Sequence, residues 1–113
     1  MAGMLYLVPT PIGNLSDISV RCRKTLEAAD FIAAEDTRVT LKLLNYLEIK
    51  KPLVSYYEHN KLESGPKIVS RIQNGETCVL VSDAGSPAIS DPGEDLVRLC
   101  AEAGITVCAI PGP

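Results

Sequence analysis

Residues 78–87 read CVLVSDAGSP, and this stretch indicates the fold class. The unbroken apolar run over residues 78–81 is typical of a strand buried on both of its faces, as strands are inside a parallel sheet. The run stops at residues 82–87, which are small, polar or turn-forming. A strand of this kind needs a layer of helices on each side of its sheet.

Four other short apolar runs resemble this strand, and they occupy residues 4–8, 31–34, 53–56 and 105–110. The segments between them carry apolar residues three or four positions apart, which is the spacing of an amphipathic helix. Strands and helices that alternate in this way predict an α/β fold, with a parallel sheet and helices on both faces. At 113 residues, the chain has the length of one domain, over residues 1–113.

Capping residues predict where the helices begin. Ser16 or Asp17 is expected to cap the first helix, because a short oxygen-bearing side chain can accept from free backbone N–H groups. Residues 57–65 are polar and are expected to form a loop, with Pro66 in the first turn of the third helix. Asp91 is expected to cap the fourth helix rather than to bind a ligand.

The charge balance limits the partners of the chain. Eleven basic and fourteen acidic side chains give a formal net charge of −3. A free-standing nucleic-acid-binding domain usually has a basic face, so this balance argues against one. It does not exclude RNA as a substrate, because a further domain or a second subunit could carry basic surface.

Cysteine spacing and hydropathy exclude other classes. Cys22, Cys78, Cys100 and Cys108 form no C-x-x-C motif, so we expect no metal site and interpret the four as small buried apolar residues. No apolar run approaches the ~18 residues of a membrane span. We therefore expect no membrane association and a reducing, cytoplasmic location.

Ligands of open parallel sheets bind beyond the carboxyl ends of the strands. The first such loop, residues 9–14, is neither a G-x-G-x-x-G nor a Walker A sequence. Pro9 and Pro11 lack backbone N–H groups, so this loop is unsuited to a pyrophosphate and presents carbonyl groups instead. Either it binds a neutral or cationic ligand, or it is a rigid turn without one.

Polar residues follow the other strands. Asp83 could accept hydrogen bonds from a ribose or an ammonium group, or could stabilise its own turn. Glu35, Asp36 and Arg38 follow the second strand; they either contact a substrate at the rim of the cleft or form a helix cap and an ion pair. His59 is the only histidine and lies in a polar loop.

These motifs, in this order, resemble the ribosomal RNA small subunit methyltransferase I family, within the tetrapyrrole methylase superfamily. Each motif is modest alone, and the set is specific because it spans the chain. The matching segments are PTPIGNL (residues 9–15), AEDTR (34–38), HN (59–60), SDAGSP (82–87), ISDPG (89–93) and PGP (111–113).

The resemblance implies a sheet of strand order 3-2-4-1-5 in the first of two dissimilar domains, with the second domain beyond residues 111–113. It also implies S-adenosylmethionine as cofactor, bound between the domains. Such a domain alone would bind the cofactor weakly and catalyse nothing. By motif match, the cofactor-binding positions are Pro11, Ile12, Asp83, Ala84, Gly85, Ser86 and Pro87.

The same resemblance implies methylation of a cytidine 2′-hydroxyl in small-subunit (16S) rRNA by a homodimer. Arg38 and Asn60 are the candidate substrate-binding residues. A ribose hydroxyl is a weak acid, so a general base would help; Glu35, Asp36 and His59 are the candidates, and the sequence does not choose among them.

Two alternatives remain. One is a tetrapyrrole methyltransferase of the uroporphyrin-III or precorrin type, which usually has a glycine-rich first loop, unlike residues 9–14. The other is a non-catalytic α/β binding module.

Overall fold

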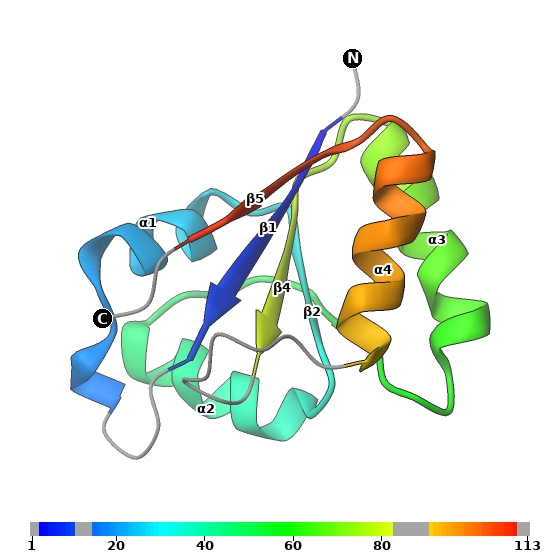
Figure 1. Ribbon diagram of the computed structural model, residues 1–113. Coiled ribbons are helices and arrows are strands. Elements are labelled where there is room, and N and C mark those ends of the chain that lie inside the picture. Colours follow the sequence, from blue (N-terminus) through cyan, green and yellow to red (C-terminus); the bar gives the residue numbers. More distant parts are fainter. Residues whose placement is uncertain (1–2, 11–14, 83–90, 111–113) are drawn as a thin grey trace.

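The structure is a computed structural model that describes residues 3–10, 15–82 and 91–110. Within these ranges, strands and helices alternate along the chain, as the apolar pattern predicts (Figure 1). The strands are β1 (Met4–Pro9), β2 (Phe31–Ala34), β3 (Leu53–Ser55), β4 (Cys78–Ser82) and β5 (Thr106–Ala109). The helices are α1 (Val20–Ala28), α2 (Thr37–Leu47), α3 (Lys61–Gln73) and α4 (Asp91–Glu102), with a short 3-10 helix, η1 (Leu15–Asp17).

The five strands form one parallel sheet of order β3-β2-β4-β1-β5. The expected fold class and strand order are therefore confirmed. β4 lies between β2 and β1, although it follows both along the chain. Its register with β1 runs from Leu5↔Cys78 to Pro9↔Ser82.

Helices α1 and α2 cover one face of the sheet, and α3 and α4 cover the other (Figure 1). Val79 and Val81 of β4 pack into an apolar cluster with side chains of α1 and α2. Cys78 and Leu80 alternate with them and pack into a second cluster, with side chains of α3 and α4. This two-sided burial explains why the run at residues 78–81 is continuously apolar.

Three of the four cysteines are buried in this core. Cys22, Cys78 and Cys100 are fully buried, as expected of small apolar residues, whereas Cys108 of β5 is only partly buried. Burial raises the pKa of the Cys78 thiol, and it raises the pKa of Cys100 to about 11, so neither forms a thiolate nucleophile near neutral pH. Among the described residues, no group of three potential ligands could hold a metal ion, and no helix is long and apolar enough to cross a membrane.

The start of α1 differs from the prediction. Ser19, rather than Ser16 or Asp17, is the N-cap, and its Oγ accepts from the backbone N–H of Cys22 at 3.1 Å. Ser19 has the extended backbone that a cap requires (φ −73°, ψ 157°). Ser16 and Asp17 belong to η1, a turn that the apolar spacing did not reveal.

The start of α3 also differs, because the helix begins at Lys61 and Pro66 lies inside it. The proline removes one helical hydrogen bond, while the Ser64 N–H still donates to the Asn60 carbonyl at 2.8 Å. Packing against α4 offsets the loss, since a Cβ added at Gly65 would lie 3.0 Å from Cδ1 of Leu99. The loop expected over residues 57–65 is thus partly helical.

Asp91 is expected from the sequence to cap α4. α4 includes Asp91 as its first residue, so Asp91 lies in the first turn rather than before it. The residue ahead of it, at position 90, is outside the described ranges.

Substitution Leu26→Ala should lower the free energy of unfolding of this chain by about 3 kcal/mol, because it leaves a cavity in a fully buried site. Leu62→Ala is the matched control, since Leu62 also lies in a helix but is 88% exposed, and it should change stability by less than about 0.5 kcal/mol. Urea unfolding followed by circular dichroism measures both. Equal losses would contradict the packing described above.

Candidate functional site

The sheet has a topological switch point between β1 and β4. β1 leads into α1, whose buried side chains pack on one face of the sheet, and β4 leads into α4, which packs on the other. In open parallel sheets, the loops at such a point diverge and leave a crevice at the carboxyl ends of the two strands, where ligands bind. The carboxyl ends of β1 and β4 are therefore the candidate site.

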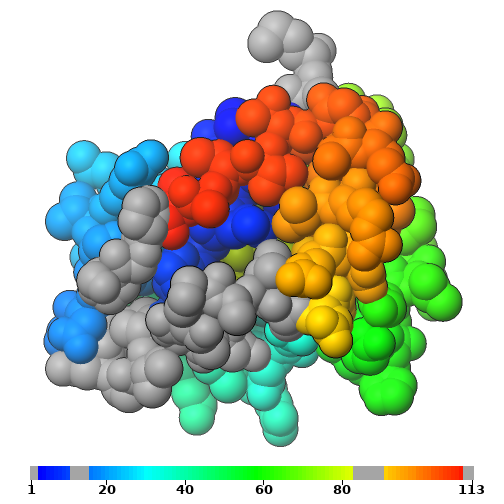
Figure 2. Space-filling model, in the orientation of Figure 1, coloured from blue at the N-terminus to red at the C-terminus, as the bar shows by residue number. Residues whose placement is uncertain are grey.

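Thr10 joins the ends of these two strands. Its backbone N–H and its Oγ1 both donate to the carbonyl oxygen of Ser82, at 3.0 and 2.6 Å. On the other side of β1, the Ile110 N–H donates to the Leu7 carbonyl at 2.8 Å. The ends of β4, β1 and β5 are thus held side by side, and in Figure 2 the surface of β1 lies recessed between β5 and α4.

The expected cofactor-binding residues belong to the two segments that continue from this junction. Residues 11–14 follow Thr10, and residues 83–90 connect Ser82 to α4. Both segments therefore begin at the ends of β1 and β4. The residues themselves lie outside the described ranges, and their roles stay predictions; they are Pro11, Ile12, Asp83, Ala84, Gly85, Ser86 and Pro87.

Asp36 caps the helix that follows β2. Its carboxylate accepts from the backbone N–H of Arg38 at 3.0 Å and from Nε of Arg38 at 3.3 Å. The side-chain hydrogen bond from Arg38 is the main cause that lowers the pKa of Asp36. A carboxylate with a lowered pKa is a weaker base. Glu35 beside it is partly buried, and its side chain forms no hydrogen bond or ion pair with any residue in the described ranges.

The structure places the two candidate substrate-binding residues differently. Arg38 pairs with Asp36 and leaves its side chain 89% exposed. Asn60 accepts from the Tyr57 N–H at 2.7 Å and donates to the Ser55 carbonyl at 3.0 Å. Both polar atoms of Asn60 therefore hold the turn between β3 and α3, whereas the Arg38 side chain is exposed and contacts Asp36.

His59 lies in the same turn, exposed, with its ring edge-on to Tyr57 at 6.2 Å between centroids. The turn follows β3, which is two strands away from β4. At ~4.8 Å per strand, this places it about 10 Å from the end of β4. Glu35 and Asp36 follow β2, the direct neighbour of β4, and so lie nearer to the candidate site.

Tyr56 and Lys61 tie this turn to α4, and the sequence did not single them out. The hydroxyl of Tyr56 donates to the Pro92 carbonyl. The ammonium group of Lys61 pairs with Asp95 at 2.5 Å and with Glu58 at 3.0 Å. The position of Tyr56 at the end of an apolar run could have indicated that it is buried. Lys61 and Asp95 are 34 residues apart, so no local sequence pattern indicates that they pair.

These contacts shift the pKa values of the groups involved. Burial raises the pKa of Tyr56 to about 12, and the hydrogen bond to Asp95 raises that of Lys61 to about 12. The same bond lowers the pKa of Asp95. All three groups thus keep their neutral-pH protonation states, and they anchor the start of α4 directly after residues 83–90.

The sequence model of one protein family, the Tetrapyrrole (Corrin/Porphyrin) Methylases, matches residues 4–113 of this chain. The chain is 56% identical to the Ribosomal RNA small subunit methyltransferase I of Halalkalibacterium halodurans and 54% identical to that of Bacillus subtilis, over 97% of its length. It spans 38% of each of these relatives, which is about two fifths of their length.

Two solved structures share the fold. The uroporphyrin-III-C-methyltransferase from Thermus thermophilus superposes with a TM-score of 0.73 at 20% identity, over 99% of this chain and 48% of that one. A diphthine synthase superposes with a TM-score of 0.77 at 17% identity, over 97% and 44%. At these identities the likeness extends to the fold alone.

The ion pair of Asp95 makes stability depend on pH. The folded-state pKa of Asp95 lies below its ordinary value of 3.8, so its stabilising effect is present above that value and is lost as the pH falls through the folded-state pKa. Asp95→Asn should therefore destabilise the chain at pH 7 and destabilise it less at pH 2.5. Urea unfolding at both values measures this.

Glu94→Gln is the control for that experiment, because Glu94 is the exposed neighbour of Asp95 and forms no ion pair with a described residue. It should change stability little at either pH. A loss for Asp95→Asn that is the same at pH 7 and pH 2.5 would show that the carboxylate charge does not matter.

Proposed function

The chain belongs to the tetrapyrrole (corrin/porphyrin) methylase family, and on this premise we propose that residues 1–113 are the cofactor-binding domain of an S-adenosylmethionine-dependent methyltransferase. The observation that carries the proposal is the junction of Thr10 with Ser82 at the switch point. Both segments that contain the expected cofactor-binding residues begin at this junction. The greater length of the relatives supports a second, substrate-binding domain.

The residue types in and next to the strands around the switch point suit this cofactor. Residues 4–10, 78–82 and 106–110, which form the strands around the switch point, contain no basic side chain. A phosphate-bearing ligand would need basic groups or a cradle of N–H groups, whereas a sulfonium cation and an adenosine do not. Carbonyl groups at Pro9 and Pro11, and the Asp83 carboxylate, are suited to the cation and to ribose hydroxyls.

The cofactor supplies an activated methyl group. The protein must hold an acceptor oxygen in line with that group and exclude water, and positioning alone can lower a barrier by about 7–11 kcal/mol. A base that removes the hydroxyl proton adds roughly 10²–10⁴-fold. We favour Glu35 for this role, because Asp36 is engaged as a helix cap and His59 lies one strand farther from the crevice.

We propose small-subunit (16S) rRNA as the substrate, and the 2′-hydroxyl of a cytidine as the methyl acceptor. The printed names of relatives at 56% and 54% identity support the rRNA. The alternative, a tetrapyrrole methyltransferase of the uroporphyrin-III or precorrin type, has weaker support, because the solved uroporphyrin-III enzyme is only 20% identical. Cytoplasmic location and a homodimeric state stay predictions, and a non-catalytic binding module is the remaining alternative.

Asp83→Ala in the full-length enzyme should weaken binding of S-adenosylhomocysteine at least about ten-fold, because lost hydrogen bonds to a charged group cost about 1.5–3 kcal/mol. Glu102→Ala is the control: it also removes one carboxylate, from the last residue of α4, and should leave the affinity unchanged. Isothermal titration calorimetry measures both. Unchanged affinity for Asp83→Ala, with the fold intact, would assign Asp83 to local turn structure only.

A strain that lacks the full-length gene should lose one cytidine 2′-O-methyl group from its 16S rRNA, and the wild-type gene should restore it. The Glu35→Gln gene should restore it at a rate lower by roughly 10²-fold or more. Mass-spectrometric mapping of the rRNA after induction measures both effects. An intact methylation pattern in the deletion strain would overturn the substrate, and full-rate restoration by Glu35→Gln would overturn the role of Glu35.

A further inference from the structure

The two faces of the domain treat their basic side chains differently. On the α3–α4 side, over described residues 53–82 and 91–110, each of the four basic side chains forms an ion pair. The pairs are Lys61–Asp95 at 2.5 Å, Lys67–Glu63 at 3.2 Å, Arg71–Glu76 at 2.9 Å and Arg98–Asp95 at 2.6 Å. The cations of this face are therefore neutralised within the domain.

The α1–α2 side, residues 15–52, has seven basic side chains, of which only Arg23 and Arg38 form ion pairs. The other five have no acidic partner among the described residues, and four of the five are exposed. We refer to them as the α1–α2 basic surface; they are Arg21, Lys24, Lys42, Lys50 and Lys51.

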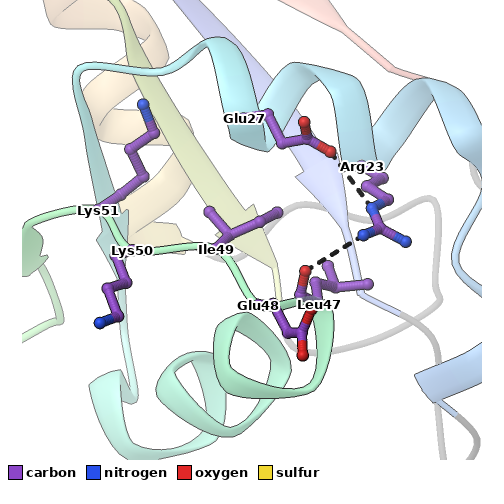
Figure 3. A pocket seen from close by; sticks show the side chains of 7 residues that line it. All are labelled: Arg23, Glu27, Leu47, Glu48, Ile49, Lys50 and Lys51. Atoms are coloured by element: carbon purple, nitrogen blue, oxygen red, sulfur yellow. Dashed lines mark hydrogen bonds and ion pairs between the residues drawn. The ribbon is translucent and has the colours of Figure 1, made fainter.

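Lys50 and Lys51 border an open pocket of about 330 Å³ between α1 and the end of α2 (Figure 3). In this pocket, the Arg23 guanidinium already donates hydrogen bonds to the Glu27 carboxylate at 3.2 Å and to the Leu47 carbonyl at 3.2 Å. In Figure 3 the side chains of Lys50 and Lys51 extend away from Arg23 and to opposite sides of the loop. The two ammonium groups therefore do not converge on one small anion. They are arranged to contact separate phosphates of a larger polyanion.

We propose that the α1–α2 basic surface binds backbone phosphates of the RNA substrate. This inference rests on the function proposed above, and it identifies the side of this domain that the RNA contacts. An unpaired ammonium group gains affinity for a phosphate by releasing counterions, whereas a paired one would first have to give up its carboxylate. The net charge of −3 is consistent with this, because basic groups outnumber acidic ones seven to six on the α1–α2 side.

The opposite face disfavours RNA. The described residues of the α3–α4 side contain seven acidic side chains against four basic ones, so this face repels a polyanion. The domain measures 35 × 28 × 22 Å, so the whole basic surface lies within one domain length of the switch point. A folded rRNA segment can therefore span both.

The test measures binding of the full-length enzyme to small ribosomal subunits from the deletion strain, across 50–300 mM KCl. The double variant Lys50→Gln/Lys51→Gln should reduce the slope of log K against log salt by about 1 for each lysine that contacts a phosphate. Lys67→Gln/Arg98→Gln removes the same charge from the α3–α4 side and should leave the slope unchanged. Unchanged affinity for S-adenosylhomocysteine shows that each variant is folded.

An unchanged slope for Lys50→Gln/Lys51→Gln, or an equal reduction in the control, would overturn the inference. A changed sedimentation coefficient of the free enzyme with an unchanged slope would overturn it too, and would show that a second copy covers this surface. The proposed function is tested separately, by measuring methyl transfer from S-adenosylmethionine to the same subunits by the wild-type enzyme. Methylation with an unchanged slope would contradict the RNA surface alone.

Discussion

The parallel pairing of β1 with β4 is the interaction on which the rest of the structure depends. It joins residues 4–9 to residues 78–82, across most of the chain, and it closes with the hydrogen bonds from Thr10 to the Ser82 carbonyl. The helices after these strands cover opposite faces, and in open parallel sheets this arrangement marks the place where ligands bind. The two segments with the expected cofactor-binding residues begin at the ends of these two strands.

The two helical layers around this pairing have different properties. The α3–α4 layer is tied together by Tyr56, by the Lys61–Asp95 ion pair and by the close approach at Gly65. Each of its four basic side chains forms an ion pair within the layer. This layer fixes the start of α4, which directly follows residues 83–90. In the α1–α2 layer, five of the seven basic side chains have no acidic partner among the residues that the structure describes. One layer therefore supports the proposed cofactor site, and the other is available to a polyanionic substrate.

The sequence predicted the strands well because each leaves a local apolar run, both in the buried strands β2 and β4 and in the partly buried edge strands β3 and β5. It did not predict that α1 begins after Ser19 or that α3 continues through Pro66, because packing against other elements decides these boundaries. Thr10 and the Lys61–Asp95 pair were missed for a related reason: their partners are distant in sequence. The strand order and the cofactor came from the family resemblance, since hydropathy alone does not order strands.

Hydrogen-exchange mass spectrometry of the full-length enzyme tests most directly whether the cofactor binds at the β1–β4 switch point. Saturating S-adenosylhomocysteine should slow exchange in peptides that cover residues 9–15 and 82–93, at the ends of β1 and β4. Peptides that cover residues 47–60, on the far side of the sheet, should exchange as before. Protection confined to residues 47–60, with none at the switch point, would contradict the account.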